Sequence, residues 1–334
     1  MPRLGLFGFP NVGKTTLFNA VTGLQSPTAP YPHTTTEPHL GVAEVPDPLL
    51  DRAAELEGSA RVVHASLELQ DGLGLPRLRE ADALIGVLRA FEDQAVPADE
   101  SGTDPRAQME DLTLSHCLAD LDVVRARQQR VQKEATADPT KRPEAAVLDR
   151  AAAALDEGEP LRALPWDEAE RRSLRDLAPL TLKPVVWVVN VGEDQEPAAP
   201  PADALVLSVR LEEEGSRLSP QDRAELFEGL GLGEGAAATM VRAAYRALGL
   251  ISFYTLNQRE AHAWTVEEGA TAWQAAGKVH SDLQRGFIRA EVTGIHSLLE
   301  AGGWAKAKQA GLVRVEGRDY VVEEGDVLLV RFSI

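Results

Sequence analysis

The sequence is poor in cysteine, in aromatic residues and in long apolar runs, and each shortage excludes a class of protein. One cysteine, Cys117, occurs in 334 residues, which excludes an internal disulfide and fits a reducing compartment. Seven histidines are scattered without H-E-x-x-H spacing. No apolar run approaches the ~20 residues of a membrane-spanning helix, and the first residues lack a signal-peptide pattern. We therefore expect a cytoplasmic protein without a membrane partner.

The charge is strongly unbalanced towards acid. The formal net charge is −18, which argues against a protein that coats nucleic acid or anionic lipid over its whole surface. It leaves room for a local basic patch. Hydrophobic residues make up 44% and charged residues 26%, as in ordinary globular proteins, and the length predicts two or three domains.

Apolar runs alternate with helical patterns in the first half of the chain, which predicts an α/β fold with a doubly wound sheet. Continuous runs at 83–88, 184–190 and 204–209 suit parallel strands covered on both faces. Edge and half-buried strands are expected at 39–45 and 63–69.

A helical insertion interrupts this sheet. Its seam is expected to follow apolar residues three or four apart, namely Leu114, Leu118, Leu121 and Val124, with Val131 one heptad later. A second, antiparallel helix is expected to begin near Leu148. A third helix is expected at 166–177, and a further helical stretch at 221–248. From 250 onwards, short strands at 251–256, 261–267, 288–292, 312–315, 319–322 and 327–332 surround one helix at 270–284, as in a small α+β domain. We predict a nucleotide-binding domain at 1–103 and 183–249, the insertion at 104–182 and a C-terminal domain at 250–334.

The strongest chemical signal is the stretch from Gly8 to Thr15, GFPNVGKT, which fits G-x-x-x-x-G-K-[ST] between a predicted strand and helix. Glycines let backbone N–H groups converge on phosphate oxygens, and the helix start adds partial positive charge. Lys14 is expected to bridge the β- and γ-phosphates, and the Thr15 hydroxyl to ligate Mg²⁺. The predicted nucleotide-binding residues of this loop are Asn11, Val12, Gly13, Lys14, Thr15 and Thr16. The alternative is a chance match in a glycine-rich turn.

Two later segments have the order expected of nucleotide sensors. Thr35, in YPHTTTEP, lies in a loop long enough to reach the γ-phosphate and Mg²⁺. Asp71 ends a strand and begins D-x-x-G, so its carboxylate can hold Mg²⁺ through water while the Gly74 N–H meets the γ-phosphate. Each match taken alone can also be an ordinary turn.

With these motifs, the chain resembles the YchF/Obg-like ATPase family of P-loop NTPases over nearly its whole length. The resemblance rests on FPNVGKTTLFNAVTG (9–23), YPHTTTEPHLGVAEVPDP (31–48), ALIGVLRAFED (83–93), PVVWVVNVGED (184–194) and WTVEEGATAWQAAGKVHSDLQRGFIRAEV (264–292). It implies that the insertion is a coiled-coil arm and that the C-terminal domain is a TGS module, a ubiquitin-like β-grasp. It also implies ribosome association through both.

The base-reading segment departs from the guanine motif N-K-x-D. Asn190, Val191, Gly192 and Glu193 stand at that place, so the lysine is absent and the acidic side chain is one methylene longer. The resemblance implies that ATP binds at least as well as GTP. Asn190 is expected to meet the purine, with a strand-ending turn residue as the alternative, and Ser208 is expected to lie near the base.

The residue after D-x-x-G is Leu75, which cannot polarise a water molecule. Slow turnover is therefore expected, with Lys14, Thr35, Gly74 and Mg²⁺ carrying catalysis, and with K⁺ or a partner assisting. The loop after Gly74 is shorter than in the family, which indicates a diverged paralogue. A nucleotide-sensing RNA or ribosome adaptor with little or no hydrolysis is the alternative function. A small-molecule kinase is disfavoured because no acceptor-binding lid is evident.

The predicted arm carries a local basic stretch. Residues 125–142 contain six basic and two acidic side chains in an otherwise acidic chain. At the end of a helical arm this stretch can face RNA phosphates, while a solvated helix face is the plainer interpretation.

Overall fold

The computed structural model describes residues 1–26, 38–93, 102–192, 199–230 and 235–333. The chain forms two compact units, each assembled from two separate stretches. Unit 1 contains Met1–Val42 and Glu68–Met240, and unit 2 contains Ala43–Leu67 and Val241–Ile334. Residues 43–67 therefore belong with the C-terminal part of the chain, whereas the sequence analysis placed them in the nucleotide-binding domain.

Unit 1 is built on a six-stranded sheet of order β2-β4-β1-β5-β6-β7. β1 pairs in parallel with both β4 and β5, and β6 pairs in parallel with β5 and β7. The central strands are apolar on both faces, and Leu4, Leu84 and Val188 are fully buried. The strand bounds are β1 (Arg3–Phe7), β2 (His39–Glu44), β4 (Ser66–Asp71), β5 (Ala83–Ala90), β6 (Val185–Val191) and β7 (Leu205–Leu207). This sheet confirms the α/β prediction.

Short helices accompany these strands, and two of them begin at a serine cap. Ser208 caps α7 through its hydroxyl, and Ser219 caps α8. The bounds are α1 (Lys14–Thr22), α3 (Leu75–Leu78), α7 (Val209–Ser216), α8 (Pro220–Gly229) and α9 (Ala236–Ala247). Sequence analysis placed one interrupted helical region at 221–248, and the structure has α8 and α9 there.

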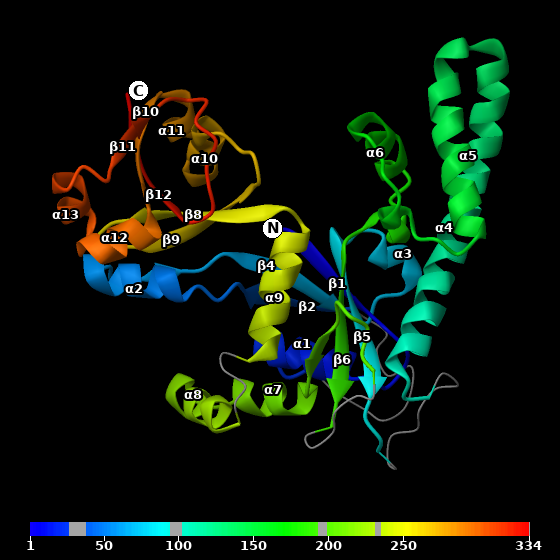
Figure 1. Cartoon of the computed structure of the whole chain (residues 1–334), viewed down its shortest axis with the longest axis horizontal. Coiled ribbons are helices and arrows are strands. Elements are labelled where there is room, and N and C mark those ends of the chain that lie inside the picture. The colour runs from blue at the N-terminus through cyan, green and yellow to red at the C-terminus, as the bar shows by residue number, and fades with distance from the viewer. Residues whose placement is uncertain (27–37, 94–101, 193–198, 231–234, 334) are drawn as a thin grey trace. The chain divides into compact units, whose positions relative to one another are not determined.

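The insertion is a helical hairpin, as predicted. Figure 1 shows α4 and α5 side by side, joined by a short turn. The buried seam on α4 follows Cys117, Leu121, Val124 and Val131, which lie on one helix face. The elements are α4 (Pro105–Ala137), η1 (Pro139–Lys141), α5 (Arg142–Asp156), η2 (Leu161–Ala163), α6 (Glu168–Arg175) and η3 (Leu180–Leu182).

The predicted start of that seam was wrong. Leu114 and Leu118 are 48% and 55% exposed, whereas Cys117 is fully buried. Spacing alone cannot choose between two adjacent stripes on a helix, because 114 and 118 are as well spaced as 117 and 121. The packing partner decides, and here it selects the stripe that contains Cys117.

Unit 2 has its own mixed sheet of order β11-β10-β12-β8-β9-β3, in which a β8–β9 hairpin is followed by a helix and β12 returns parallel to β8. That is a β-grasp arrangement. Phe253, Ala276 and Val292 are fully buried between the sheet and α10. The strands are β3 (Val62–Val63), β8 (Leu250–Leu256), β9 (Ala261–Glu267), β10 (Phe287–Gly294), β11 (Arg314–Glu316) and β12 (Asp326–Phe332), and the helices are α2 (Pro48–Glu57), α10 (Ala272–Val279), α11 (Ser281–Arg285), α12 (Ile295–Ala301) and α13 (Trp304–Gln309).

Residues 43–67 are anchored within unit 2 by specific contacts. β3 adds a parallel edge strand to β9, and the hydroxyl of Tyr254 donates to the Oδ2 of Asp47 over 2.5 Å. Asp47 also caps α2 through its other carboxylate oxygen. Long-range pairing therefore splits the strand expected at 63–69 into β3 in this sheet and β4 in the sheet of unit 1.

Two other expectations for unit 2 were wrong. The helix expected at 270–284 is divided at His280, whose backbone is extended, into α10 and α11. The stretch 319–322 forms only an isolated bridge from Val321 to Thr271 rather than a strand. None of the described helices is long and apolar enough to cross a membrane.

Candidate functional site

The loop between β1 and α1 approaches two neighbouring strands so closely that glycine is required at two positions. At Gly8, where φ is 146°, a Cβ would lie 2.4 Å from the carbonyl oxygen of Val87 in β5. At Gly13, where φ is 102°, a Cβ would lie 2.5 Å from the Nδ2 of Asn190 in β6. Both glycines have backbone angles that other residues rarely adopt. The loop has the close-packed backbone that the phosphate-loop motif requires.

The start of α1 offers free backbone donors. Its first helical hydrogen bond joins Leu17 N to Gly13 O over 2.9 Å, and no side chain caps Gly13. The amides of Lys14, Thr15 and Thr16 consequently have no partner within the helix. Together with the partial positive charge of the helix N-terminus, they form an anion-binding end.

The Lys14 side chain folds back into the loop. Its ammonium donates to the carbonyl oxygens of Phe9 over 2.6 Å and Gly8 over 3.1 Å. Burial lowers the pKa of Lys14, and the negative charge of Asp71 opposes that change. The cation is therefore held inside the loop, where phosphate oxygens can replace the two carbonyl partners.

Thr15 and Asp71 lie together although 56 residues separate them in sequence. The Thr15 hydroxyl donates to Asp71 Oδ2 over 2.6 Å. The pairing of β1 with β4 brings them to one edge of the sheet, as the sequence analysis expected for Thr15 and Asp71. Asp71 is 1% exposed, and its Oδ1 has no hydrogen-bond partner in the described structure.

That pair fits Mg²⁺. A hydroxyl that donates to a carboxylate keeps its oxygen lone pairs for a cation, and Mg²⁺ prefers oxygen ligands. A buried carboxylate oxygen without a partner is costly, so a cation or its water is a suitable complement. Gly74, the end of D-x-x-G, begins the short helix α3.

The side-chain amide of Asn190 bonds to two segments of the backbone. Its Nδ2 donates to Val12 O over 2.9 Å, and its Oδ1 accepts from Val209 N over 3.1 Å. Asn190 is 7% exposed and Val12 is 2% exposed. The side chain therefore ties the phosphate loop to the start of α7, and purine contact by Asn190 stays a prediction.

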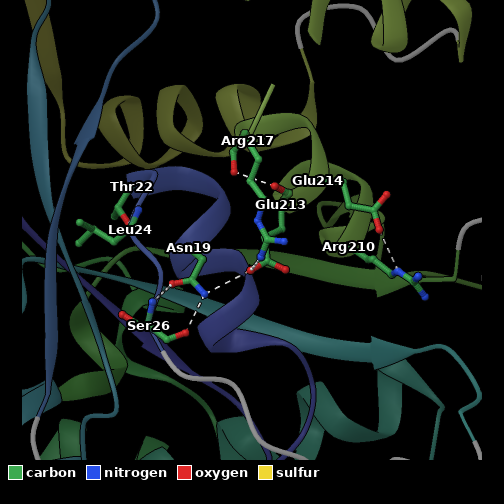
Figure 2. A network of polar contacts seen from close by, with 9 residues as sticks. Asn19, Thr22, Leu24, Ser26, Arg210, Glu213, Glu214 and Arg217 are labelled. Atoms are coloured by element: carbon green, nitrogen blue, oxygen red, sulfur yellow. Dashed lines mark hydrogen bonds and ion pairs between the residues drawn. The ribbon is translucent and has the colours of Figure 1, made fainter. Parts of the chain in front are cut away.

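A second network fixes the far end of α1, and the sequence gives no signal for it. Figure 2 shows Asn19 between Ser26 and Glu213. Asn19 Oδ1 accepts from Ser26 N over 2.8 Å, and its Nδ2 donates to Ser26 O over 3.0 Å and to Glu213 Oε1 over 3.3 Å. Arg217 in turn donates to the same Glu213 oxygen over 3.0 Å. This network holds α1 against α7 and fixes the chain just after α1.

The other predicted site residues are placed less directly. Thr35 and Glu193 lie outside the described residues. Ser208 uses its hydroxyl to cap α7, accepting from Leu211 N, and Val191 ends β6 next to Asn190. Asn11 adopts a left-handed backbone with φ of 60° within the phosphate loop. The structure thus brings Lys14, Thr15 and Asp71 together. The phosphate, metal and base-reading roles of these and the other site residues stay predictions.

Two protein-family models match this chain, one near each end. A model described as "50S ribosome-binding GTPase" matches residues 3–115, and the model YchF-GTPase_C, described as a protein of unknown function (DUF933), matches residues 250–333. The ribosome-binding ATPase YchF of Bacillus subtilis is 35% identical over 361 aligned positions, covering 99% of each chain. The chain belongs to the YchF family.

Other members of the family are also similar to this chain along its whole length. The ribosome-binding ATPase YchF of Escherichia coli O157:H7 is 36% identical, with 99% of each chain covered. A solved YchF GTPase from Schizosaccharomyces pombe has a TM-score of 0.84 and 25% identity, covering 99% of this chain and 97% of its own. These matches over the whole chain confirm the predicted P-loop fold and the predicted membership of the YchF family.

Proposed function

We propose that the protein binds a purine nucleoside triphosphate at residues 8–15 and hydrolyses it slowly, as a regulatory NTPase of the ribosome. The observation that carries this proposal is the Thr15–Asp71 pair of 2.6 Å beside the partly buried Lys14, at the open N-terminus of α1. Backbone amides that can donate to phosphate, a lysine ammonium and a candidate metal-binding pair therefore lie in one place. The names of the curated relatives, ribosome-binding ATPases, support the same function.

Each residue has a role that follows from its place. The amides of Lys14, Thr15 and Thr16 face the phosphates, and the Lys14 ammonium exchanges its two carbonyl partners for β- and γ-phosphate oxygens. Thr15 and Asp71 would hold Mg²⁺, and a bound Mg²⁺ would supply positive charge beside the phosphates. Thr35 and the Gly74 amide contact the γ-phosphate.

Both purines are proposed substrates, with ATP bound at least as well as GTP. The curated relatives are named ATPases, whereas the solved fungal relative is named a GTPase. Glu193 in place of aspartate supports weak discrimination, because one or two hydrogen bonds contribute only about 1–3 kcal/mol.

A nucleotide-sensing adaptor with little hydrolysis is the second candidate, and the segment after Asp71 favours it. Only residues 72–82 separate β4 from β5, and within them Leu78 and Ala81 are buried. A segment anchored this closely to the core has little freedom to rearrange around a γ-phosphate. Leu75, at the water-orienting position, adds no polar group.

The arm tip offers a surface for ribosomal RNA. Arg125 and Arg127 are paired with Asp156 and Glu144. Three further basic side chains of the tip are exposed and form no ion pair with any described residue: Arg130, Lys133 and Arg142. Free cations at the end of a projecting hairpin suit contact with phosphates. Action at ribosomes would agree with a cytoplasmic protein.

Calorimetric titration with ATP, ADP, GTP and GDP in the presence of Mg²⁺ tests binding, with Lys14→Ala as the inactive variant and Lys306→Ala as the surface control. Steady-state hydrolysis with and without ribosomes, and with and without K⁺, then separates the two candidates. Binding of any of these nucleotides with ribosome-stimulated turnover supports the regulatory NTPase. Binding without turnover under every condition supports the adaptor, and no binding of any of the four rejects both.

A further inference from the structure

A histidine that the phosphate-loop motif does not include faces the metal pair. His39 begins β2, and β2 lies beside β4, which ends in Asp71. The Nδ1 of His39 is 3.7 Å from Asp71 Oδ2, the oxygen that also accepts from Thr15. The His39 ring packs at a tilt against the ring of Phe18 in α1, with the ring centroids 5.9 Å apart.

Two buried polar atoms at this place have no hydrogen-bond partner among the described residues: His39 Nδ1 and Asp71 Oδ1. The whole Asp71 side chain is nearly inaccessible, with 1% of the residue exposed. Orphaned polar atoms inside a protein cost free energy unless a ligand or water satisfies them. His39 Nδ1 and Asp71 Oδ1 lie on adjacent strands, and the Thr15 hydroxyl donates to the other oxygen of Asp71. These two unsatisfied atoms together indicate a ligand that both residues share.

We propose that His39 supplies a nitrogen donor to the divalent cation held by Thr15 and Asp71, and that it shifts the selectivity of this site from Mg²⁺ towards Mn²⁺. Two donors that each lie about 2.1 Å from one metal are about 3–4 Å apart, and the 3.7 Å between His39 and Asp71 falls in that range. Carboxylate and hydroxyl oxygens suit both Mg²⁺ and Mn²⁺, whereas an imidazole nitrogen is a softer donor that adds more affinity for a transition-metal ion such as Mn²⁺ than for Mg²⁺. This inference rests on the proposed nucleotide site.

The protein donors are too few to hold a metal alone. No group of three or more histidine, cysteine, aspartate or glutamate side chains suited to a metal occurs in the described part of the chain. Phosphate oxygens of the nucleotide must therefore complete the coordination. Mn²⁺ should bind this site tightly only when a nucleotide is present.

Pulsed electron paramagnetic resonance of Mn²⁺ with ADP bound to the full-length protein tests the proposal. A coordinated imidazole nitrogen gives a ¹⁴N modulation, which should change to a ¹⁵N pattern when the protein is labelled with ¹⁵N-histidine. The signal should disappear in His39→Asn and persist in His64→Asn. His64 is a matched control, because its side chain is 21% exposed against 22% for His39 and it also faces a carboxylate, that of Asp51.

Calorimetry adds a readout that does not depend on turnover. The ratio of ADP affinities measured with Mn²⁺ and with Mg²⁺ should fall about tenfold in His39→Asn, since loss of a metal-site partner typically costs at least that factor. A wild-type complex that binds Mn²⁺-ADP without histidine modulation overturns the inference while the proposed function stands. An unchanged metal ratio in a folded His39→Asn protein also overturns it. Failure of the wild type to bind any nucleotide rejects the proposed function itself.

Discussion

Arg79 Nη1 lies 2.6 Å from Oδ1 of Asp120, a carboxylate with no exposed surface. Arg79 follows α3, just after the D-x-x-G segment, and Asp120 is on α4 near the base of the arm. The other Arg79 nitrogen donates to Ala119 O over 2.9 Å, and Asp120 also accepts from the amides of Leu180 and Thr181. Arg79 therefore joins the segment after D-x-x-G to the arm.

Arg79→Ala should lower the free energy of unfolding by about 3–5 kcal/mol, because it leaves the buried Asp120 charge without its cation. Chemical denaturation monitored by circular dichroism measures the change. Arg125→Ala removes a pair whose side chains are 50% and 59% exposed, and should cost less than about 1 kcal/mol. Equal losses in the two variants would contradict a buried anchoring role for Arg79.

His116 predicts an acid-dependent loss of stability. It is packed against Phe7, with ring centroids 4.7 Å apart, and burial lowers its pKa from the usual 6.5 to about 4, although Asp120 opposes that change. Between these values the unfolded chain binds the proton and the folded chain does not, so stability falls as pH drops from 6.5 to 4.

Over that range the wild type should lose about 3 kcal/mol more than His116→Gln, which has no imidazole to titrate. Urea unfolding curves at several pH values measure the difference. Below pH 4 the two proteins should lose stability in parallel, because His116 is then protonated in both the folded and unfolded wild type. Identical slopes between pH 6.5 and 4 would rule out a buried neutral His116.

Gly13→Ala should reduce nucleotide affinity by more than about tenfold, since both its φ of 102° and its 2.5 Å approach to Asn190 resist a methyl group. Gly23→Ala is the matched control: its φ is 68°, but nothing lies within 4 Å of the added Cβ. That variant should lose about 1 kcal/mol of stability and keep its affinity. Calorimetric titration distinguishes the two, and equal affinity losses would mean that backbone strain alone explains the effect.

Sequence analysis predicted that Lys14, Thr15 and Asp71 lie at one site, because each belongs to a recognisable local motif, and the structure brings them together. The G-x-x-x-x-G-K-[ST] spacing between an apolar strand and a helix is typical of the close-packed loop that the structure has at 8–15. Asp71 was expected near Thr15 because the carboxyl ends of parallel strands meet at one edge, and the hydroxyl–carboxylate contact agrees with that.

What sequence analysis missed depends on contacts between distant segments. His39 looks like one more polar residue of a threonine-rich stretch, and only the neighbouring position of β2 and β4 brings it to Asp71. The strand expected at 63–69 has good alternation throughout, yet Val62 and Val63 pair with β9, nearly 200 residues away. Local patterns define what an element is, but not the sheet that it joins.

Glu193→Asp should shift the nucleotide preference towards GTP. The shorter side chain restores the length of the aspartate that accepts from the guanine N1 and N2 groups in N-K-x-D proteins. The ratio of ATP affinity to GTP affinity should therefore fall several-fold, because one or two hydrogen bonds to the base contribute about 1–3 kcal/mol. Competition between the two nucleotides for the same protein measures the ratio. An unchanged ratio would show that residue 193 does not read the base.

Thr15→Ala should remove most of the Mg²⁺ dependence of nucleotide binding while leaving the binding measured in EDTA unchanged. The hydroxyl is both the proposed ligand and the donor to Asp71, so its loss weakens the cation site without touching the backbone amides that face the phosphates. The Mg²⁺-dependent gain in affinity should fall by about tenfold or more. Thr22→Ala is the control on the same helix, because its hydroxyl donates to Phe18 O and accepts from Leu24 N at the end of the helix, away from Asp71. If Thr15→Ala and Thr22→Ala retain the same response to Mg²⁺, the metal is held by other groups.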